Sequence, residues 1–245
     1  MICIEKGALI TISFHGKEKI SGKIFDTTSA EEAKKAGIFI EKGIYKAIPV
    51  IVGHGDIIKG LDEALFSMNK GEEKEVELIP EKAFGQRKPE LIRLVPLNEF
   101  KKRSLNPVKG MPVNVNDSIG RIQSVSGGRV RVDFNNELAG KTIQFKVKIE
   151  SVIENKEEKI KILLEKYFPF IGKEFKFSLE GDSLKVELKE KYSKVLEIVK
   201  PLFEKALKET LKEIKKTEYS LIKEKAKEKE ESKESGKEIP ENDDI

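Results

Sequence analysis

Alternating apolar and polar positions predict several strands in the first two thirds of the chain. Residues 10–14 alternate and are rich in β-branched side chains, which is typical of a half-buried strand. Residues 20–25 continue the pattern, with Gly22 at a turn or bulge, and residues 76–79 form another short strand. The cleanest period of two lies at 143–149, where every second residue is apolar. The chain therefore has a strand-rich part.

Residues 111–134 contain short β units of their own. Met111, Val113 and Val115 alternate with polar residues, as do residues 130–134. Gly127-Gly128 lies between the last two strands, as a tight hairpin needs. The character of the chain changes after residue 85, where a basic stretch begins.

The last third alternates between helical and strand patterns. An apolar face at Ile160–Phe168 predicts a helix, and two strands at 175–179 and 184–188 flank a Gly181-Asp182 turn. A last strand is expected around Tyr219, Leu221 and Lys223, giving the order α-β-β-α-β. The second helix carries one stripe, in which Pro201 is tolerable if it lies in a first helical turn. The stripe consists of Leu196, Val199, Phe203, Leu207, Leu211 and Ile214. Residues 225–245 are almost all charged or polar and are expected to be disordered.

Composition narrows the class of protein. The 245 residues suggest two or three domains, and 37% of them are charged. The abundance of Lys and Glu with few Gln indicates a heat-adapted source. Because the net charge is only +4 and the two signs are interleaved, we do not expect a nucleic-acid partner. The single cysteine, the lack of a secretion signal and the absence of a membrane-length apolar run predict a cytoplasmic protein.

Three motifs occur in an informative order. Phe25-Asp26-Thr27-Thr28 is followed by the strand–turn–helix segment 52–65 and then by Pro80-Glu81-Lys82-Ala83-Phe84-Gly85. Together they resemble the FKBP-type peptidyl-prolyl cis-trans isomerases. Residues 133–141 (DFNNELAGK) resemble the corresponding phrase of SlyD-like and archaeal members, in which a module called insert-in-flap interrupts the isomerase domain.

The resemblance implies an α+β fold with an FKBP-like antiparallel sheet wrapped on a short helix. A small β-rich inserted domain and an α-β-β-α-β C-terminal domain would be added to it, as in long-chain archaeal FKBPs. The implied boundaries are 1–85 and 136–153 for the isomerase domain, 86–135 for the insert, 154–224 for the C-terminal domain and 225–245 for the tail.

The resemblance also implies a site without an acid, base or nucleophile. Asp26 would face the reacting amide, and the Ile58 N–H would donate to a substrate carbonyl. Phe14 and Phe84 take the places of tyrosines, and Leu61 that of a tryptophan, so the pocket should be shallower than in many relatives. The complete set is Phe14, Phe25, Asp26, Ile57, Ile58, Leu61, Phe84 and Phe145. Without the motifs, the apolar members would be interpreted as ordinary core.

The expected activity is peptidyl-prolyl cis-trans isomerisation (EC 5.2.1.8) combined with holdase or foldase activity on unfolded or nascent polypeptides. No cofactor is expected, and His15 and His54 are too isolated for a metal site. A module of about 50 residues cannot bury all its apolar side chains. The insert's chaperone surface is therefore predicted to include Leu91, Ile92, Leu94, Val95, Phe100 and Met111.

Other hypotheses remain open. The C-terminal domain is expected to form a homodimer, because its second apolar stripe exceeds what a small module can cover. An isomerase-inactive chaperone or assembly module is the main alternative function. A third hypothesis treats the β-rich insert, with Arg121, Arg129 and Arg131, as an RNA-binding barrel.

Overall fold

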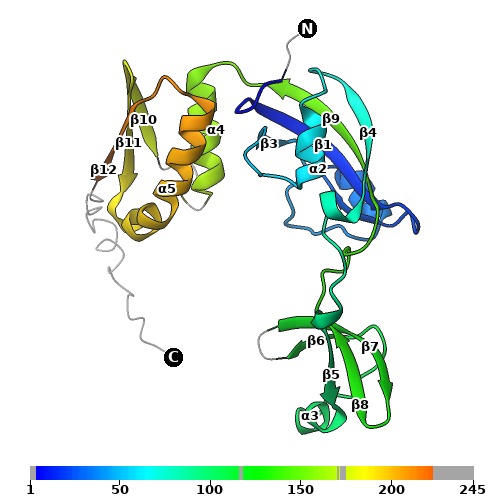
Figure 1. The fold of residues 1–245 in the computed structure, drawn as a ribbon. Coiled ribbons are helices and arrows are strands. Elements are labelled where there is room, and N and C mark those ends of the chain that lie inside the picture. Colours follow the sequence, from blue (N-terminus) through cyan, green and yellow to red (C-terminus); the bar gives the residue numbers. More distant parts are fainter. Residues whose placement is uncertain (1–3, 116–117, 170, 172–174, 223–245) are drawn as a thin grey trace, which may run out of the picture. The chain divides into compact units, whose positions relative to one another are not determined.

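The computed structural model describes residues 4–115, 118–169, 171 and 175–222. The chain divides into two compact units, Met1–Ile162 and Leu163–Ile245. Strands dominate: they form one five-stranded, one four-stranded and one three-stranded sheet, with few helices between them (Figure 1). The fold is thus mixed and rich in strands, as predicted.

A five-stranded sheet organises most of the first unit. The strand β1 pairs along its length with β9 and, on its other side, with β2 and β3, while β4 pairs with the far side of β9. All these pairs are antiparallel. The strands are β1 (Leu9–Glu18), β2 (Ile24–Thr27), β3 (Ile48–Ile51), β4 (Glu73–Leu78) and β9 (Ile143–Val152).

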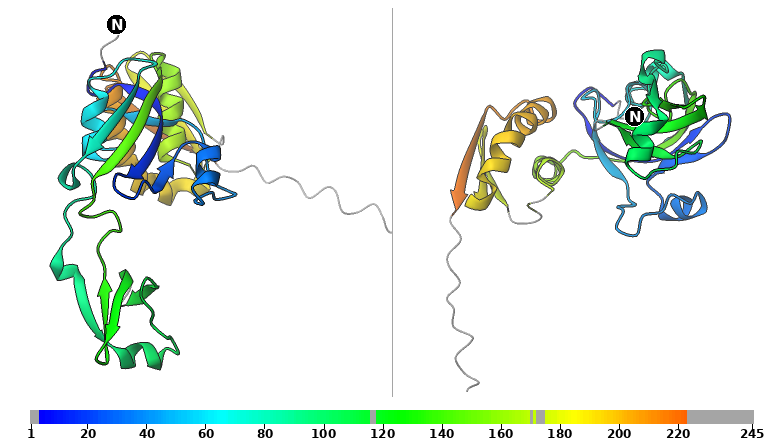
Figure 2. Two further views of the ribbon diagram at one scale, coloured as in Figure 1. Left: turned by 90° about the vertical axis from the view of Figure 1, so that its right-hand side faces the viewer. Right: turned by 90° about the horizontal axis from the view of Figure 1, so that it is seen from below.

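The short helix α2 (Lys59–Leu65) covers one face of this sheet (Figures 1 and 2). Leu61 and Leu65 are buried in the same apolar cluster as alternate residues of β1 and β9. Gly60 allows the close approach, because a Cβ there would lie 2.5 Å from Leu78. Two short elements complete this part: α1 (Ala30–Lys35), capped by Ser29, and the 3-10 turn η1 (Pro80–Lys82).

A separate four-stranded sheet lies in the chain between β4 and β9. Its order is β5-β8-β7-β6, and all its pairs are antiparallel. The core is small and consists of Phe100, Val113, Ile122, Val130 and Val132. The elements are η2 (Pro89–Leu91), β5 (Ile92–Pro96), α3 (Leu97–Lys102), β6 (Pro112–Val115), β7 (Ser118–Ser126) and β8 (Arg129–Asp133). We refer to residues 86–135 as the insert.

The part of the chain after β9 has the predicted order of elements, and the boundary between the two units falls within its first helix. The strands β10 and β11 form a hairpin around Gly181, whose φ is +63°, and β12 adds to β11 in parallel after the crossover through α5. Figure 2 shows α5 on one face of this sheet. The elements are α4 (Lys156–Tyr167), β10 (Lys176–Glu180), β11 (Ser183–Lys189), η3 (Glu190–Tyr192), α5 (Ser193–Thr210) and β12 (Lys216–Ile222). Lys223 and the charged tail lie outside the described residues.

The helix α5 differs from the sequence prediction at two points. Pro201 lies in the middle of the helix and not in the first turn, where it would be easily tolerated. The helix continues past this residue, which has no N–H to donate and lies at an exposed position. The helix ends at Thr210, and Leu211 and Ile214 follow it as buried residues of the connection to β12.

The apolar stripe of α5 is already covered within its own unit. Phe203 is fully buried against the rings of Tyr167 and Phe168, at centroid distances of 6.2 and 5.7 Å. Five of the six residues of the stripe are buried and Val199 is partly buried, so most of the stripe that motivated a homodimer is not exposed. The homodimer itself stays a prediction, as do the domain boundaries, the heat-adapted source and the compartment. Among the described residues, no helix is both long and apolar enough to span a membrane.

Candidate active site

Four phenylalanine rings meet on the helix-covered face of the five-stranded sheet. Phe25 contacts Phe84 and Phe145 edge to face, with ring centroids 5.6 and 5.8 Å apart. Phe14 lies 5.9 Å from Phe145. Phe145 is buried, whereas the other three are partly exposed. We call these four residues the aromatic cluster. The aromatic cluster is thus an apolar surface that is partly accessible to solvent.

The Phe-Asp-Thr-Thr step fixes the strand that carries Phe14. The Phe14 N–H donates to Thr28 Oγ1 at 2.9 Å, and the Thr28 N–H donates to the Phe14 carbonyl at 3.0 Å. Asp26 pairs with Gly16 across β1 and β2. Because antiparallel partners share a face of the sheet, Asp26 lies on the same face as Phe14, and it is exposed.

The turn before α2 is held by two carboxylates. Asp56 Oδ2 accepts from the Ile51 N–H at 2.8 Å, and Asp62 Oδ1 accepts from the Gly53 N–H at 2.9 Å. These bonds fold the chain back so that Ile57 and Ile58 pack, half-buried, against the core. Asp62 is itself 8% exposed, so its role in the turn is structural.

The Pro80–Gly85 step presents Phe84. The Gly85 N–H donates to the Pro80 carbonyl at 2.7 Å, and Gly85 has φ +77°, which favours glycine. Gln86 donates to Glu81, and this hydrogen bond lowers the pKa of the Glu81 carboxyl. The step is therefore a closed turn that turns the Phe84 ring toward Phe25.

The structure brings the predicted site residues into one region of the fold. Ile57, Ile58 and the aromatic cluster all belong to or pack against one apolar core. Leu61 is 2% exposed and forms part of the floor. The motifs thus place apolar groups around one surface, with Asp26 as a carboxylate on the same face of the sheet.

Gly16 is a site residue that sequence reasoning missed. A Cβ at this position would lie 2.7 Å from Phe25 Cζ and 2.8 Å from Phe145 Cε1. The two rings therefore meet over a backbone without a side chain. The only sequence signal was a glycine two residues after Phe14 in the strand, which is unusual because glycine weakens strands.

The DFNNELAGK phrase joins the two chain segments that lead into and out of the insert. The Lys88 N–H donates to Asn135 Oδ1 at 2.8 Å, and Asn135 Nδ2 donates back to the Lys88 carbonyl at 2.9 Å. Nearby, the Gly140 N–H donates to the Gly85 carbonyl at 2.8 Å. We call the Lys88–Asn135 pair the junction clamp.

Asp133 supports the junction clamp from the end of β8. It is 4% exposed, and its Oδ1 accepts from the Asn135 N–H at 2.9 Å. Its Oδ2 accepts from Gln123 at 2.8 Å and forms an ion pair with Arg87. A nearly buried carboxylate with these partners is satisfied, so its contribution is structural.

We expect Asn135→Ala to lower the free energy of unfolding by about 0.5–1.5 kcal/mol, because it removes two exposed hydrogen bonds to the Lys88 backbone and the part-buried bond from Asn135 Nδ2 to Asp133 Oδ1. Urea denaturation measures this loss. The matched control is Asn98→Ala, at an exposed position of α3, which should change stability by less than about 0.5 kcal/mol. If both changes lower the free energy of unfolding equally, the junction clamp does not contribute to stability.

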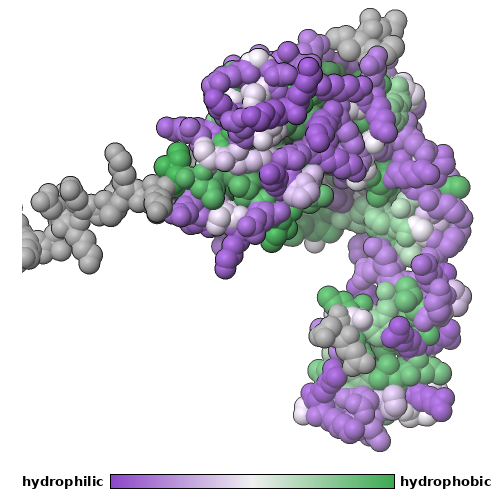
Figure 3. Space-filling model, turned by 60° about the vertical axis from the view of Figure 1, so that its left-hand side comes forward, coloured by the Kyte–Doolittle hydropathy of each residue, from purple (hydrophilic) through white to green (hydrophobic). Residues whose placement is uncertain are grey.

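The predicted chaperone residues differ in their exposure. Leu94 is 59% exposed, and Leu91, Ile92, Val95 and Met111 are partly buried. Phe100 is an exception to the prediction: it is 3% exposed, because α3 turns it onto the sheet as part of the insert's core. Further apolar side chains reach the surface of the insert, namely Leu105, Val108, Ile119 and Val125. Figure 3 shows apolar surface among polar surface on this part of the chain.

Metal chemistry has no candidate in the described part of the chain, where no group of three or more His, Cys, Asp or Glu is placed to hold an ion. His15 Nδ1 instead lies 2.7 Å from Thr27 Oγ1, on the strand pair that carries the Phe-Asp step.

Comparison with known proteins agrees with the geometry of the site. Residues 3–98 match the family of FKBP-type peptidyl-prolyl cis-trans isomerases, and residues 93–138 match a family described as FKBP26, IF domain. The chain is 36% identical over 149 residues to the short-type peptidyl-prolyl cis-trans isomerase of Methanocaldococcus jannaschii, a match that covers 61% of this chain and 94% of that protein. The chain therefore belongs to the FKBP-type peptidyl-prolyl cis-trans isomerases.

Two bacterial relatives place it further within the family. It is 34% identical over 106 residues to a probable FKBP-type 16 kDa isomerase of Pseudomonas fluorescens, covering 41% of this chain and 69% of that one. It is also 30% identical over 162 residues to SlyD of Helicobacter pylori, covering 64% and 78%. The protein is thus an FKBP-type isomerase similar to SlyD.

Proposed function

We propose that the aromatic cluster, with Ile57, Ile58 and Leu61, binds the proline of a substrate chain. The observation that carries this proposal is the meeting of four phenylalanine rings, within 5.6–5.9 Å of their neighbours, on one open apolar surface. A proline ring is compact and apolar, so it gains by displacing water from such a surface.

Rotation about the Xaa-Pro bond needs no proton transfer or covalent step. The barrier of about 18–20 kcal/mol arises because the twisted amide loses its resonance. The twisted amide has less charge separation than the planar one, so an apolar environment favours it. Asp26 acts through its charge at the edge of the pocket, and the Ile58 N–H holds a substrate carbonyl. The rate should accordingly be nearly independent of pH near neutrality.

We also propose a second activity, the binding of unfolded chains by the insert. Among its described residues the apolar core cluster has only five buried side chains, and the insert exposes large apolar side chains, Leu94 and Ile119 among them, at 59 and 77%. A large apolar patch on the surface of a domain often marks a binding site. The match of residues 93–138 to a family of IF domains adds support. The protein would hold unfolded or nascent polypeptides through the insert while the pocket isomerises their prolines.

An exchange assay on a short Xaa-Pro peptide tests the isomerase site. We expect Phe84→Ala to lower kcat/KM by at least about tenfold, because it removes a partly exposed wall of the pocket and loses transition-state contacts. Phe66→Ala is the matched control: Phe66 is 42% exposed at the end of α2 and lies outside the aromatic cluster. Its loss should leave the rate unchanged.

The same assay separates the leading function from its alternative. If the wild-type protein does not accelerate exchange but still suppresses aggregation of a denatured protein, the chain is an isomerase-inactive chaperone. If Phe84→Ala and Phe66→Ala lower the rate equally, the aromatic cluster is core and the catalytic surface lies elsewhere.

A further inference from the structure

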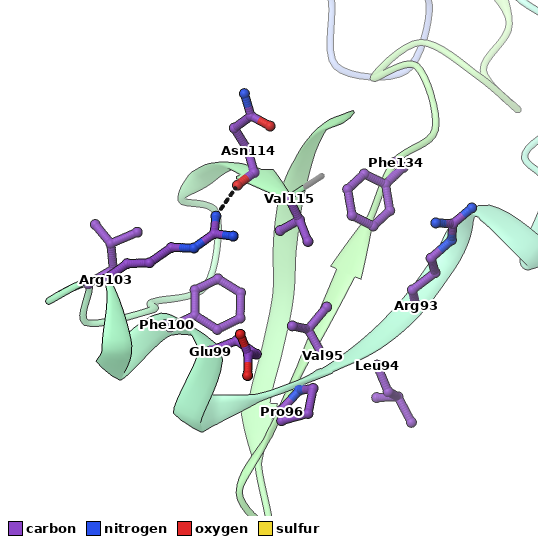
Figure 4. Close-up of a pocket in the computed structure, with 11 residues that line it drawn as sticks. Arg93, Leu94, Val95, Pro96, Glu99, Phe100, Arg103, Asn114, Val115 and Phe134 are labelled. Carbon is purple, nitrogen blue, oxygen red and sulfur yellow. Dashed lines mark hydrogen bonds between the residues drawn. The ribbon is translucent and has the colours of Figure 1, made fainter. Parts of the chain in front are cut away.

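A pocket of about 340 Å³ lies on the insert between β5, α3 and β6 (Figure 4). Val95, Phe100, Val115 and Phe134 form its apolar part. Figure 4 shows the side chains of Arg103 and Arg93 on opposite sides of these residues. The pocket thus combines an apolar floor with two guanidinium groups.

The strand register puts Arg93 on the pocket side of the sheet. Arg93 pairs with Val132 and Val95 pairs with Val130, and both valines are fully buried in the insert's core. Cross-strand partners share a face, so Arg93 and Val95 face the core side. Leu94 pairs with Arg131 and lies on the opposite face. The sheet of the insert therefore carries arginines on both faces. Arg93 lies on the face with the pocket, and Arg131 lies on the other face.

Both guanidinium groups at the pocket are available to a carboxylate. Arg93 lies over the ring of Phe134, 5.5 Å from its centroid, and Arg103 Nη1 donates to the Asn114 carbonyl at 3.1 Å. Neither forms an ion pair with another described residue, and both are exposed. The acidic residue at the pocket, Glu99, is paired with Lys102 at 2.9 Å.

The net charge of the insert also favours a negatively charged partner. Residues 86–135 contain ten lysines and arginines against four aspartates and glutamates, whereas the whole chain has a net charge of only +4. The positive charge is thus concentrated in the insert, which corrects the expectation that the two signs are evenly mixed. A concentrated positive field attracts negatively charged partners from a distance.

We propose that this pocket binds segments of unfolded proteins in which an aromatic or aliphatic side chain is flanked by aspartate or glutamate. The apolar side chain enters the pocket over Phe100, and the flanking carboxylates pair with Arg93 and Arg103. Guanidinium groups suit this role because they bind carboxylates in a forked geometry. This inference rests on the proposed binding of unfolded chains and specifies which segments are preferred.

Three fluorescent peptides test the proposal on the full chain. They share one leucine- and phenylalanine-containing centre without proline and differ in their flanks, which are glutamate, serine or lysine. In fluorescence anisotropy at low salt, we expect the glutamate peptide to bind about tenfold more tightly than the lysine peptide. The difference should shrink as salt is raised, whereas binding of the serine peptide should persist.

Paired charge reversals identify the arginines responsible. The double change Arg93→Glu and Arg103→Glu should invert the order of the glutamate and lysine peptides. The matched control, Arg129→Glu and Arg131→Glu, makes the same change in charge at exposed positions of β8 whose neighbours face the core. It should keep the order. Arg93→Gln with Arg103→Gln, checked by circular dichroism, should abolish the preference without adding negative charge.

Each other outcome has a distinct meaning. If all three peptides bind equally, the charge preference is wrong but the binding of unfolded chains stands. If none of them binds to the wild-type protein, the proposed chaperone function fails. If both double reversals change the order alike, the preference comes from net charge and not from this pocket. Tighter binding of a single-stranded RNA oligonucleotide than of the glutamate peptide would overturn the proposal in favour of a nucleic-acid partner.

Discussion

Excision of residues 89–134, with Lys88 and Asn135 rejoined by a short Gly/Ser loop, is expected to separate the two activities. Catalysed refolding of a denatured protein limited by proline isomerisation should fall by roughly 100-fold. Isomerisation of a short Xaa-Pro peptide should change little. The two rates, measured side by side on the same preparation, give the result.

The physical reason is effective concentration. A short peptide needs only the pocket, whereas a long unfolded chain that is held by the insert presents its prolines to the pocket again and again. Tethering of this kind raises apparent affinity by about 10²–10⁴-fold without any new contact at the reacting bond. The affinity supplied by the insert is lost with it, and the aromatic cluster remains.

The structure dictates where the chain should be cut. The junction clamp between Lys88 and Asn135 and the bond from Gly140 to Gly85 hold the two connecting segments together outside the excised part. The shortened chain should therefore keep its five-stranded sheet, which circular dichroism and thermal unfolding can verify. If both substrates lose activity equally, the insert supports the pocket and does not supply a separate binding site.

Elements with strong periodicity were predictable from the sequence, and elements without it were missed. The strand β9 was predicted because its buried residues, from Ile143 to Ile149, alternate without a break. The strand β7 was not predicted as a separate strand. Only Gly120 and Ile122 of its nine residues are buried, so its sequence shows almost no alternation of apolar and polar residues. In β7 the pairing with β6 and β8 determines the conformation more than the side chains do.

The end of α5 shows a second limit of sequence patterns. Apolar residues continue at helical spacing through Leu211 and Ile214, and both are buried, but the helix stops at Thr210. A stripe reports which residues face the core and not which backbone conformation they adopt. The same effect led to the expectation of a homodimer, since a sequence cannot show that Phe168 covers Phe203.

At the site, the motifs identified the side chains that contact one another. They did not identify Gly16, which contributes because it has no side chain and so leaves room for two rings. The phenylalanines and isoleucines were recognisable because they are apolar and lie in matching order. Gly16 and the hydrogen bonds of Thr28 and Asp62 depend on tertiary packing, so local patterns do not reveal them. Asn135 was included in a resembling phrase, but its bonds to Lys88 span 47 positions.

We expect Gly16→Ala to damage the pocket strongly although it adds a single methyl group. Gly16 is not in the left-handed region of backbone space, so alanine meets no backbone strain there. The methyl group must instead displace the rings of Phe25 and Phe145, which lie 2.7 and 2.8 Å from its position. Overpacking of this kind costs about 1–3 kcal/mol of stability. A misplaced ring can lower peptide isomerisation by up to about 100-fold.

Gly120→Ala supplies a control with the same geometry in the insert. A Cβ there would lie 2.7 Å from Val132 and 2.8 Å from Phe134, which lines the insert's pocket. The two changes therefore add the same methyl group at similar distances from two side chains, and at Gly120 the methyl group also lies 3.0 Å from the Asp133 carbonyl oxygen. Gly120→Ala should weaken the binding of unfolded protein by a measurable factor and leave peptide isomerisation intact, while Gly16→Ala should do the reverse.

The comparison distinguishes a local role from general destabilisation. Both variants are assayed well below their unfolding temperatures, for peptide isomerisation and for suppression of aggregation. A crossed pattern of losses means that each glycine preserves the surface next to it. If Gly16→Ala loses stability but keeps full peptide activity, the packing of Phe25 on Phe145 is not part of the catalytic surface. The proline would then have to bind against Ile57, Ile58 and Phe84 instead.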